Sequence, residues 1–102
     1  DIGAFLDNVV FIELLKRGYQ VQIGKLDELE IDFIASEGND KLYIQVAYLL
    51  ADPATRDREY RPLRIIPDNY PKFVLTMDRM PAGNDEGIQR MYLPDFLRSA
   101  AA

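Results

Sequence analysis

The segment LYIQVAYLL, residues 42–50, constrains the fold of this chain more than any other feature. Its nearly continuous apolar character is typical of a central strand that is covered on both faces. The preceding segment LEIDFIA, residues 29–35, alternates between apolar and polar residues, as a strand with one buried face does. The loop SEGNDK between them is rich in turn-forming residues. The sequence therefore predicts a β-hairpin whose second strand lies inside a sheet.

Because side chains alternate along a strand, each residue of the hairpin can be assigned to a face. The first strand is expected to place four apolar residues together: Leu29, Ile31, Phe33 and Ala35. Its opposite face would carry Glu30, Asp32 and Ile34. The second strand is expected to place Tyr43, Gln45 and Ala47 on a common face.

The remaining segments complete an α/β pattern. Residues 1–19 form an apolar repeat with helical spacing (Phe5, Val9, Ile12 or Phe11, and Leu15), and Gly18 follows where a left-handed C-cap is expected. Residues 19–26 and 72–78 are predicted strands, and residues 90–100 a short strand with a helical turn. Residues 79–89 are predicted to be a loop.

Residues 51–68 are predicted to be a second helix, with Asp52 as N-cap and Pro53 at the first position. Pro62 lacks an amide donor and crowds the preceding turn, so we expect a kink or break near Arg61. The connection through this helix is long enough for a right-handed parallel crossover. The predicted fold is a mixed-sheet α/β sandwich in the order helix-strand-strand-strand-helix-strand.

Composition narrows the chemistry that this chain can perform. Its 102 residues predict a single domain, residues 1–102, and there is no Cys and no His. Thiolate or imidazole zinc sites and Ser-His or Cys-His nucleophile pairs are therefore excluded. A net charge of −5 disfavours nucleic acid as a partner, although Arg56, Arg58, Arg61 and Arg64 lie close together in the sequence. No apolar run is long enough to span a membrane, and we expect a cytoplasmic protein.

The element order and the polar residues at four positions resemble the restriction-endonuclease-like, or PD-(D/E)XK, superfamily. That resemblance implies a three-layer core with a catalytic site at Asp7, Asp32 and Gln45, and with Ala47 in the place of the family's lysine. In such enzymes two or three carboxylates hold Mg²⁺ against the scissile phosphate, and the lysine assists the attacking water. On this model Asp32 and Asp7 would be the metal ligands.

Two of these positions depart from a working nuclease. Gln45 is neutral and supplies no charge to a metal ion, and Ala47 can neither orient water nor stabilise an oxyanion. Loss of an electrostatic stabiliser such as the family's lysine raises a reaction barrier by on the order of 3 kcal/mol. Nuclease activity by the usual mechanism is therefore not expected.

A closer resemblance accounts for both losses. The blocks DNVVFIELLKRGYQVQIGKL, EIDFIA, YIQVAYLL, TRDREYRPLRII and DNYPKFVLTMD are similar to a domain of unknown function at the C-terminus of bacterial AAA-type ATPases. In that family the glutamine form of the third-strand motif is usual. The resemblance implies an upstream ATPase domain of the same polypeptide as partner, and it implies that ATP binds there. Because the chain begins at Asp1, we expect it to be the C-terminal part of such a longer protein.

Two functional hypotheses remain open at this stage. The first is an interaction or regulatory module without catalysis and without a cofactor of its own, since no Walker A motif occurs. The alternative is a divergent Mg²⁺-dependent nuclease or nucleic-acid-binding domain. In that case Asp7, Glu30 and Asp32 would hold the metal, and Arg58 or Lys72 would replace the lysine.

A structural role for Asp32 competes with both hypotheses. Its carboxylate would then bond a neighbouring amide or pair with an arginine, and we expect an arginine of the second helix to neutralise Asp32 or Asp7. Self-association is a further prediction, through residues 72–78 or the terminal strand at the border of the sheet.

Overall fold

The computed structural model describes residues 1–99, so the last three residues of the predicted domain lie outside it. The element order is α1 (Ile2–Lys16), β1 (Gln20–Leu26), β2 (Leu29–Glu37), β3 (Asp40–Ala47), α2 (Pro53–Arg64), β4 (Lys72–Thr76), β5 (Gly83–Asp85), β6 (Ile88–Tyr92) and α3 (Leu93–Arg98). The first six elements follow the predicted order. Within residues 1–99, no helix is long and apolar enough to cross a membrane.

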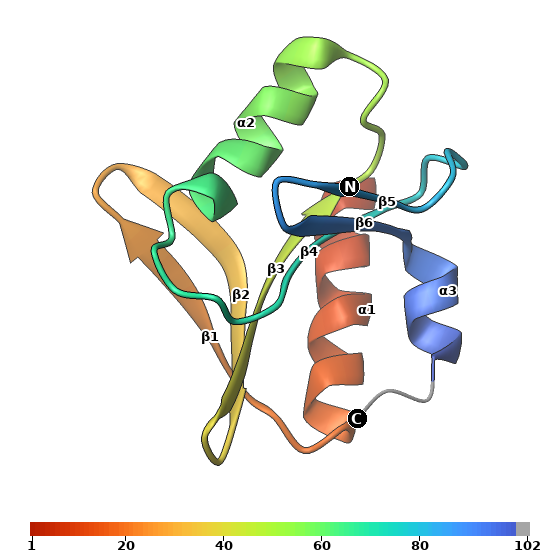
Figure 1. The fold of residues 1–102 in the computed structure, drawn as a ribbon. Coiled ribbons are helices and arrows are strands. Elements are labelled where there is room, and N and C mark those ends of the chain that lie inside the picture. The colour runs from red at the N-terminus through yellow and green to blue at the C-terminus, as the bar shows by residue number, and fades with distance from the viewer. Residues whose placement is uncertain (100–102) are drawn as a thin grey trace.

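The strands form one six-stranded mixed sheet in the order β1-β2-β3-β4-β6-β5 (Figure 1). The β1-β2, β2-β3 and β5-β6 pairs are antiparallel, whereas β3-β4 and β4-β6 are parallel. The predicted α/β class, mixed sheet and parallel crossover through α2 are confirmed. The predicted edges are wrong, because β4 and β6 are both interior and β1 and β5 form the borders.

Helices cover both faces of the sheet and create two cores (Figure 1). On one face α1 and α3 pack over buried residues of the sheet that include Phe33, Ile44 and Leu75. On the other face α2 packs through Tyr60 and Leu63 over a second buried group: Ile31, Tyr43, Ala47, Val74 and Ile88. The side chains of β3 alternate between the two cores as predicted, because this strand is covered on both sides.

Helix α1 faces the sheet with a different side from the one that its apolar repeat predicted. Its buried residues are Leu6, Val10 and Leu14, whereas Phe5 is 61% exposed. The helix is apolar around most of its circumference, so periodicity alone does not identify the inner face. Its end is as predicted, since Gly18 has a φ of 93° and donates to the carbonyl of Leu15.

A β-bulge in β2 overturns the predicted alternation in this strand. Gln22 pairs with Ile34 and Gly24 with Ile31, so two residues of β2 stand opposite one residue of β1. Ile31 and Ile34 consequently both join the α2-side core, while Phe33 joins the α1-side core. The bulge also requires glycine at position 24, where a Cβ would overlap the side chain of Ile34.

Two further predictions are wrong, one for helix α2 and one for the segment after β4. Asp52 is the N-cap and Pro53 occupies the first turn, as expected, but α2 runs through Pro62 to Arg64 without a break. Pro62 removes the one amide donor that would bond the carbonyl of Arg58, and the helix continues across this position. The predicted loop at residues 79–89 contains β5 and the start of β6, joined by a turn with positive φ at Glu86 and Gly87.

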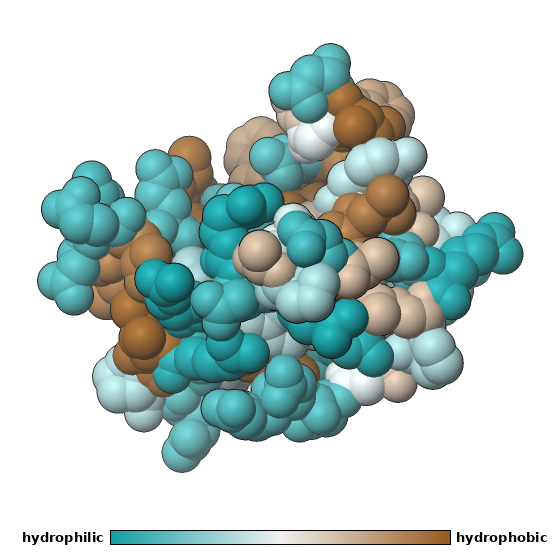
Figure 2. Space-filling model, turned by 90° about the horizontal axis from the view of Figure 1, so that it is seen from above, coloured by the Kyte–Doolittle hydropathy of each residue, from teal (hydrophilic) through white to brown (hydrophobic). Residues whose placement is uncertain are grey.

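Hydrophobic side chains also reach the surface. The face in Figure 2 is mostly hydrophilic, with hydrophobic side chains gathered in separate patches. Over residues 1–99, α1 contributes four of the large exposed apolar residues, namely Ile2, Phe5, Ile12 and Leu15. The most exposed one is Ile23 of the edge strand β1, opposite the bulge.

Candidate functional site

Asp32 and Gln45 meet where β2 and β3 separate. The ladder between these strands extends only to the pair Phe33 and Ile44. Beyond it, the Asp32 N–H donates to Oε1 of Gln45 at 2.7 Å, and Oδ2 of Asp32 accepts from the N–H of Val46 at 2.8 Å. Two side chains therefore replace the backbone hydrogen bonds that the bulge removes. The sequence prediction that Asp32 and Gln45 lie together is confirmed.

Gln45 also ties the sheet to α2. Its Nε2 donates to the carbonyl oxygen of Glu59 at 3.1 Å, while its Oε1 accepts from Asp32. The Gln45 side chain is 3% exposed, so its own amide is buried and both of its ends need partners. Both ends of the amide are thus used to join β2, β3 and α2.

The acidic groups around this junction hold their protons more tightly than usual. The pKa of Asp32 is raised to about 6, mainly by burial; the Val46 N–H opposes the shift, and the charges of Asp7 and Glu30 contribute to it. Burial likewise raises the pKa of Glu59 to about 6, with Asp32 and Asp7 adding to the shift and Arg58 opposing it. Carboxylates from α1, β2 and α2 therefore interact at one place.

Asp7 reaches this group from α1. Burial raises its pKa, and its charge acts on both Asp32 and Glu59. It also lines a surface hollow with Phe11 and Phe33, whose rings stack with their centres 6.2 Å apart. The predicted site residues Asp7, Asp32 and Gln45 are thus brought to the same region by three different elements.

The position expected for a catalytic lysine lies in a hydrophobic core. Ala47 is 5% exposed and packs in the α2-side core with Leu50 and Val74. Lys72, one of the two predicted substitutes, donates to the carbonyl oxygens of Asp68 at 2.6 Å and of Tyr70 at 3.0 Å. These bonds hold Lys72 to the loop that precedes β4.

The prediction that an arginine of α2 neutralises Asp32 or Asp7 is wrong. Arg58 lies 4.0 Å from Glu59, and Arg61 and Arg64 both pair with Asp57. Arg56 donates to the carbonyl oxygen of Leu50. The helix turns these arginines toward its own carboxylates and toward neighbouring loops, so the pKa of Asp32 stays raised.

The donors at this junction do not fit a metal site of the predicted kind. Across residues 1–99, no three Asp or Glu side chains are arranged to hold a metal ion together. One oxygen of Asp32 is bound to the Val46 N–H, and the oxygen of Gln45 is bound to the Asp32 N–H. A hard cation such as Mg²⁺ needs several oxygen ligands that converge on it, and the acids of the described residues do not converge in this way.

Glu59 is the residue that the sequence analysis missed at this site. Its backbone carbonyl receives Gln45, and its carboxyl interacts with Asp32. The available signal was its position in α2 immediately before the buried residue Tyr60 and four residues before Leu63. Helical spacing puts such a residue at the border of the buried face.

Comparisons with known proteins identify one relative by sequence. An uncharacterized protein of Haemophilus influenzae is 44% identical over 92 residues, which are 90% of this chain. The chain spans 22% of the length of that relative. No family model matches the chain, and no solved structure matches it.

Proposed function

We propose that this chain is a nuclease-like domain without catalytic activity that acts as an interaction or regulatory module of an AAA-type ATPase. The observation that carries the proposal is the bonding of Gln45. Its amide links the Asp32 N–H to the Glu59 carbonyl, so it serves to join β2 to α2. The resembled superfamily has a carboxylate free for a metal at this position.

The surroundings of Gln45 add to this support. Ala47, at the place of the expected lysine, is enclosed in the α2-side core. Burial raises the pKa values of Asp32 and Glu59, and Arg58, which lies 4.0 Å from Glu59, opposes the shift of Glu59 without cancelling it. Water activation next to a scissile phosphate needs a cation and free carboxylate oxygens. This junction offers neither in the expected places.

An apolar stripe on α1 supports the interaction role. We define it as Ile2, Phe5 and Ile12, which are exposed, whereas Val9 between them is partly buried against the α1-side core. Phe5 is 61% exposed and Ile12 is 48% exposed. Contiguous exposed apolar side chains are typical of surfaces that contact another protein or domain. The alignment with a much longer relative is consistent with a module inside a larger polypeptide.

The catalytic half of the proposal is tested with the purified chain. Single-stranded, double-stranded and branched DNA are incubated with it in Mg²⁺ and in Mn²⁺, and the products are separated on denaturing gels. We expect no metal-dependent cleavage, with a commercial nuclease as the positive control. Cleavage that disappears in Asp32→Asn would show that the site is active and would overturn this half.

The regulatory half is tested on the full-length polypeptide. Phe5→Glu places a charge in the apolar stripe and is expected to change the rate of ATP hydrolysis several-fold. Glu28→Lys, a charge change on the exposed β1-β2 turn, is the matched control and should leave the rate unchanged. A full-length protein that does not hydrolyse ATP, or one that responds equally to both variants, would contradict the regulatory role. The prediction that the chain has no nuclease activity would be unaffected.

A further inference from the structure

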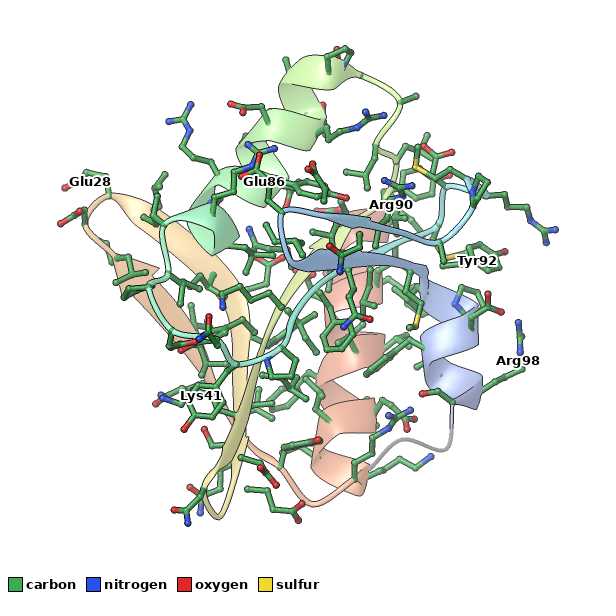
Figure 3. The ribbon with its side chains drawn as sticks, in the orientation of Figure 1. Glu28, Lys41, Glu86, Arg90, Tyr92 and Arg98 are labelled. Atoms are coloured by element: carbon green, nitrogen blue, oxygen red, sulfur yellow. The ribbon has the colours of Figure 1, made fainter. Side chains whose placement is uncertain are left out.

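Strand β1 is the less protected of the two border strands of the sheet. Border strands expose unpaired N–H and C=O groups, and proteins usually protect them by short length, proline, charge or a covering segment. The border strand β5 has three residues, one of them an aspartate, whereas β1 has seven residues and no proline. Figure 3 shows the β1-β2 turn, with Glu28 at its tip, extending away from α1 and α3.

The hydrogen bonds of the inner strands determine which backbone groups of β2 face β1. Along a regular strand, the N–H and C=O of successive residues point alternately to one neighbouring strand and to the other. The Tyr43 N–H donates to the carbonyl of Pro71 at 3.0 Å, so Tyr43 faces β4 and Ile44 faces β2. Since Phe33 is the partner of Ile44, the backbone of Phe33 faces β3 and that of Ile34 faces β1.

Three residues of β1 consequently direct their backbone groups away from the sheet. Gln22 is the partner of Ile34, so the backbone groups of Gln22 bond to β2. Its neighbours Val21 and Ile23 face outward, and so does Lys25, because the extra residue of the bulge lies in β2 and leaves the alternation of β1 unbroken. Within residues 1–99, no hydrogen bond reaches these outward groups.

The side chains beside these groups are mainly apolar. Val21 packs against the α1-side core. Ile23 lies on the same face of β1 and is 71% exposed, the largest value for a large apolar residue within residues 1–99. Lys25 is the one charged residue of β1, and it stands opposite Glu30 of β2. The charge that could protect this border therefore has an opposite charge next to it.

This pattern is complementary to a second copy of itself. In an antiparallel pair centred on Ile23, that residue faces its own copy, and Val21 faces Lys25 of the second chain. Every outward N–H and C=O of the two strands then has a partner. A register shifted by one residue leaves some of these groups unpaired, and a register centred on Lys25 brings two like charges together.

We propose that two copies of this chain associate through the outer edge of β1, in an antiparallel register centred on Ile23. The contact goes beyond the function proposed above and uses no residue of the Asp32 junction or of the apolar stripe on α1. It moves the expected self-association from β4 and β6, which are interior, to a true border of the sheet. One strand pair is a small interface, so we expect a reversible dimer with a dissociation constant on the order of 100 μM.

Sedimentation equilibrium of the purified chain, between about 10 μM and about 1 mM, measures this association. We expect the mean mass to rise from that of one chain toward that of two. Ile23→Lys places two charges opposite each other and should weaken the association about tenfold. Ile65→Lys, at another exposed isoleucine, is the matched control and should associate as the original chain does. No association up to about 1 mM, or an equal loss in both variants, would overturn the dimer.

Ile23→Pro tests the backbone contact separately from the side chain. It removes an N–H that faces solvent in the single chain, which a border strand tolerates, whereas the dimer loses hydrogen bonds at its centre. Circular dichroism should show an unchanged fold, and association should again be weakened about tenfold. Association that survives Ile23→Pro but is lost in Phe5→Glu would assign the contact to the stripe on α1 and overturn the role of β1.

Single cysteines test the register, because the chain has no cysteine of its own. In the proposed register Ile23 lies opposite its own copy, with the two Cα atoms about 5.5 Å apart, a separation that a disulfide can span. Ile23→Cys should therefore form a disulfide-linked dimer under mild oxidation, and Lys25→Cys should form much less. Cross-linking that is equal in the two variants, or faster in Lys25→Cys, would overturn the register.

Discussion

At the scale of single residues, Gln45 is bound at both ends of its amide, by the N–H of Asp32 and by the carbonyl of Glu59. Both partners are backbone groups in a region where β2 and β3 no longer pair. A side chain that satisfies such groups stabilises the folded state mainly because the alternative is a buried donor or acceptor without a partner. This structural role is sufficient to explain why residue 45 is a glutamine, and it requires no catalytic role.

Gln45→Ala is expected to lower the free energy of unfolding by about 1–3 kcal/mol, because it leaves the Asp32 N–H without its partner and removes the bond to the Glu59 carbonyl of α2. Gln89→Ala, an exposed glutamine on β6, is the matched control and should change it by less than about 0.5 kcal/mol. Urea unfolding followed by circular dichroism measures both. Equal small effects would show that Gln45 does not join β2 to α2.

At the scale of elements, α1 shows how far an apolar repeat determines orientation. Both the predicted stripe and the observed buried face have helical spacing, and they share no residue. The helix itself was predictable, because its residues favour helix and Gly18 ends it. Its rotation was not, because the choice depends on how well each side fits between β2, β3 and α3.

A matched pair of truncations tests this rotation. Leu6→Ala is expected to lower the free energy of unfolding by about 2–4 kcal/mol, since it opens a cavity in the α1-side core. Phe5→Ala removes a larger side chain that is mostly in solvent, so we expect a loss below about 1 kcal/mol. Thermal and urea unfolding of both variants give the comparison. A larger loss of stability for Phe5→Ala would indicate that α1 faces the sheet with the side that carries Phe5.

The contact between α1 and α3 rests on Arg17. Its guanidinium donates to Glu13, to the carbonyl oxygens of Phe96 and Ser99 and to the Ser99 hydroxyl, and it lies 4.4 Å from the centre of the Phe96 ring. Lysine keeps the charge but cannot form the planar, multiple contact. The packing of α3 therefore depends on an arginine at this position.

Arg17→Lys is expected to lower the free energy of unfolding by about 2 kcal/mol through the loss of these bonds. Arg98→Lys, at an exposed arginine of α3, serves as the control and should be nearly neutral. Hydrogen exchange of the α3 amides should accelerate in Arg17→Lys. Unchanged protection of α3 would show that other contacts hold this helix.

At the scale of the whole molecule, acidic groups from separate elements are coupled. In the folded chain the pKa values of Asp32 and Glu59 are about 6, above their ordinary values of 3.8 and 4.5. Burial is the main cause of both shifts, and the mutual repulsion of Asp7, Asp32 and Glu59 adds to them. The folded state therefore binds protons more tightly than the unfolded state does.

This difference sets the pH dependence of stability. Between about pH 4 and pH 6 these groups ionise in the unfolded chain but stay protonated in the folded chain, so the folded chain loses stability as the pH rises across this window and no more above it. We expect the free energy of unfolding to fall by on the order of 2 kcal/mol between about pH 4 and about pH 7, after allowing for partial exposure. Chemical unfolding across this range measures the trend, and stability that rises instead would contradict it.

Asp32→Asn isolates one member of the coupled group. The asparagine carbonyl can still accept the Val46 N–H but carries no charge, so the variant should be more stable than the original chain near pH 8. The gain should shrink as the pH falls below 6 and disappear below about pH 4, where Asp32 is protonated in the folded and the unfolded chain alike. Glu28→Gln, at an exposed acid of the β1-β2 turn, is expected to show no such pH-dependent difference.

The sequence by itself determined the elements that short-range physics controls. The apolar run of residues 42–50 indicated a strand covered on both faces, and the loop before it indicated a hairpin. Strand alternation placed Gln45 on the same face as Tyr43 and Ala47. The start and stop signals of helices identified Asp52 and Pro53 at the start of α2 and Gly18 at the end of α1. These features depend on neighbours in the chain, so they can be identified without the fold.

Only the tertiary structure decided the features that depend on contacts between distant segments. The bulge at Asp32 and Phe33 lies opposite Ile23 of β1, and the border strands follow from the insertion of β6 beside β4. The partners of Gln45 and the coupling of Asp32 with Glu59 require α2 to lie over β3. Hydrogen bonding and burial at these places depend on how the helices pack on the sheet, so they cannot be predicted from neighbouring residues in the sequence.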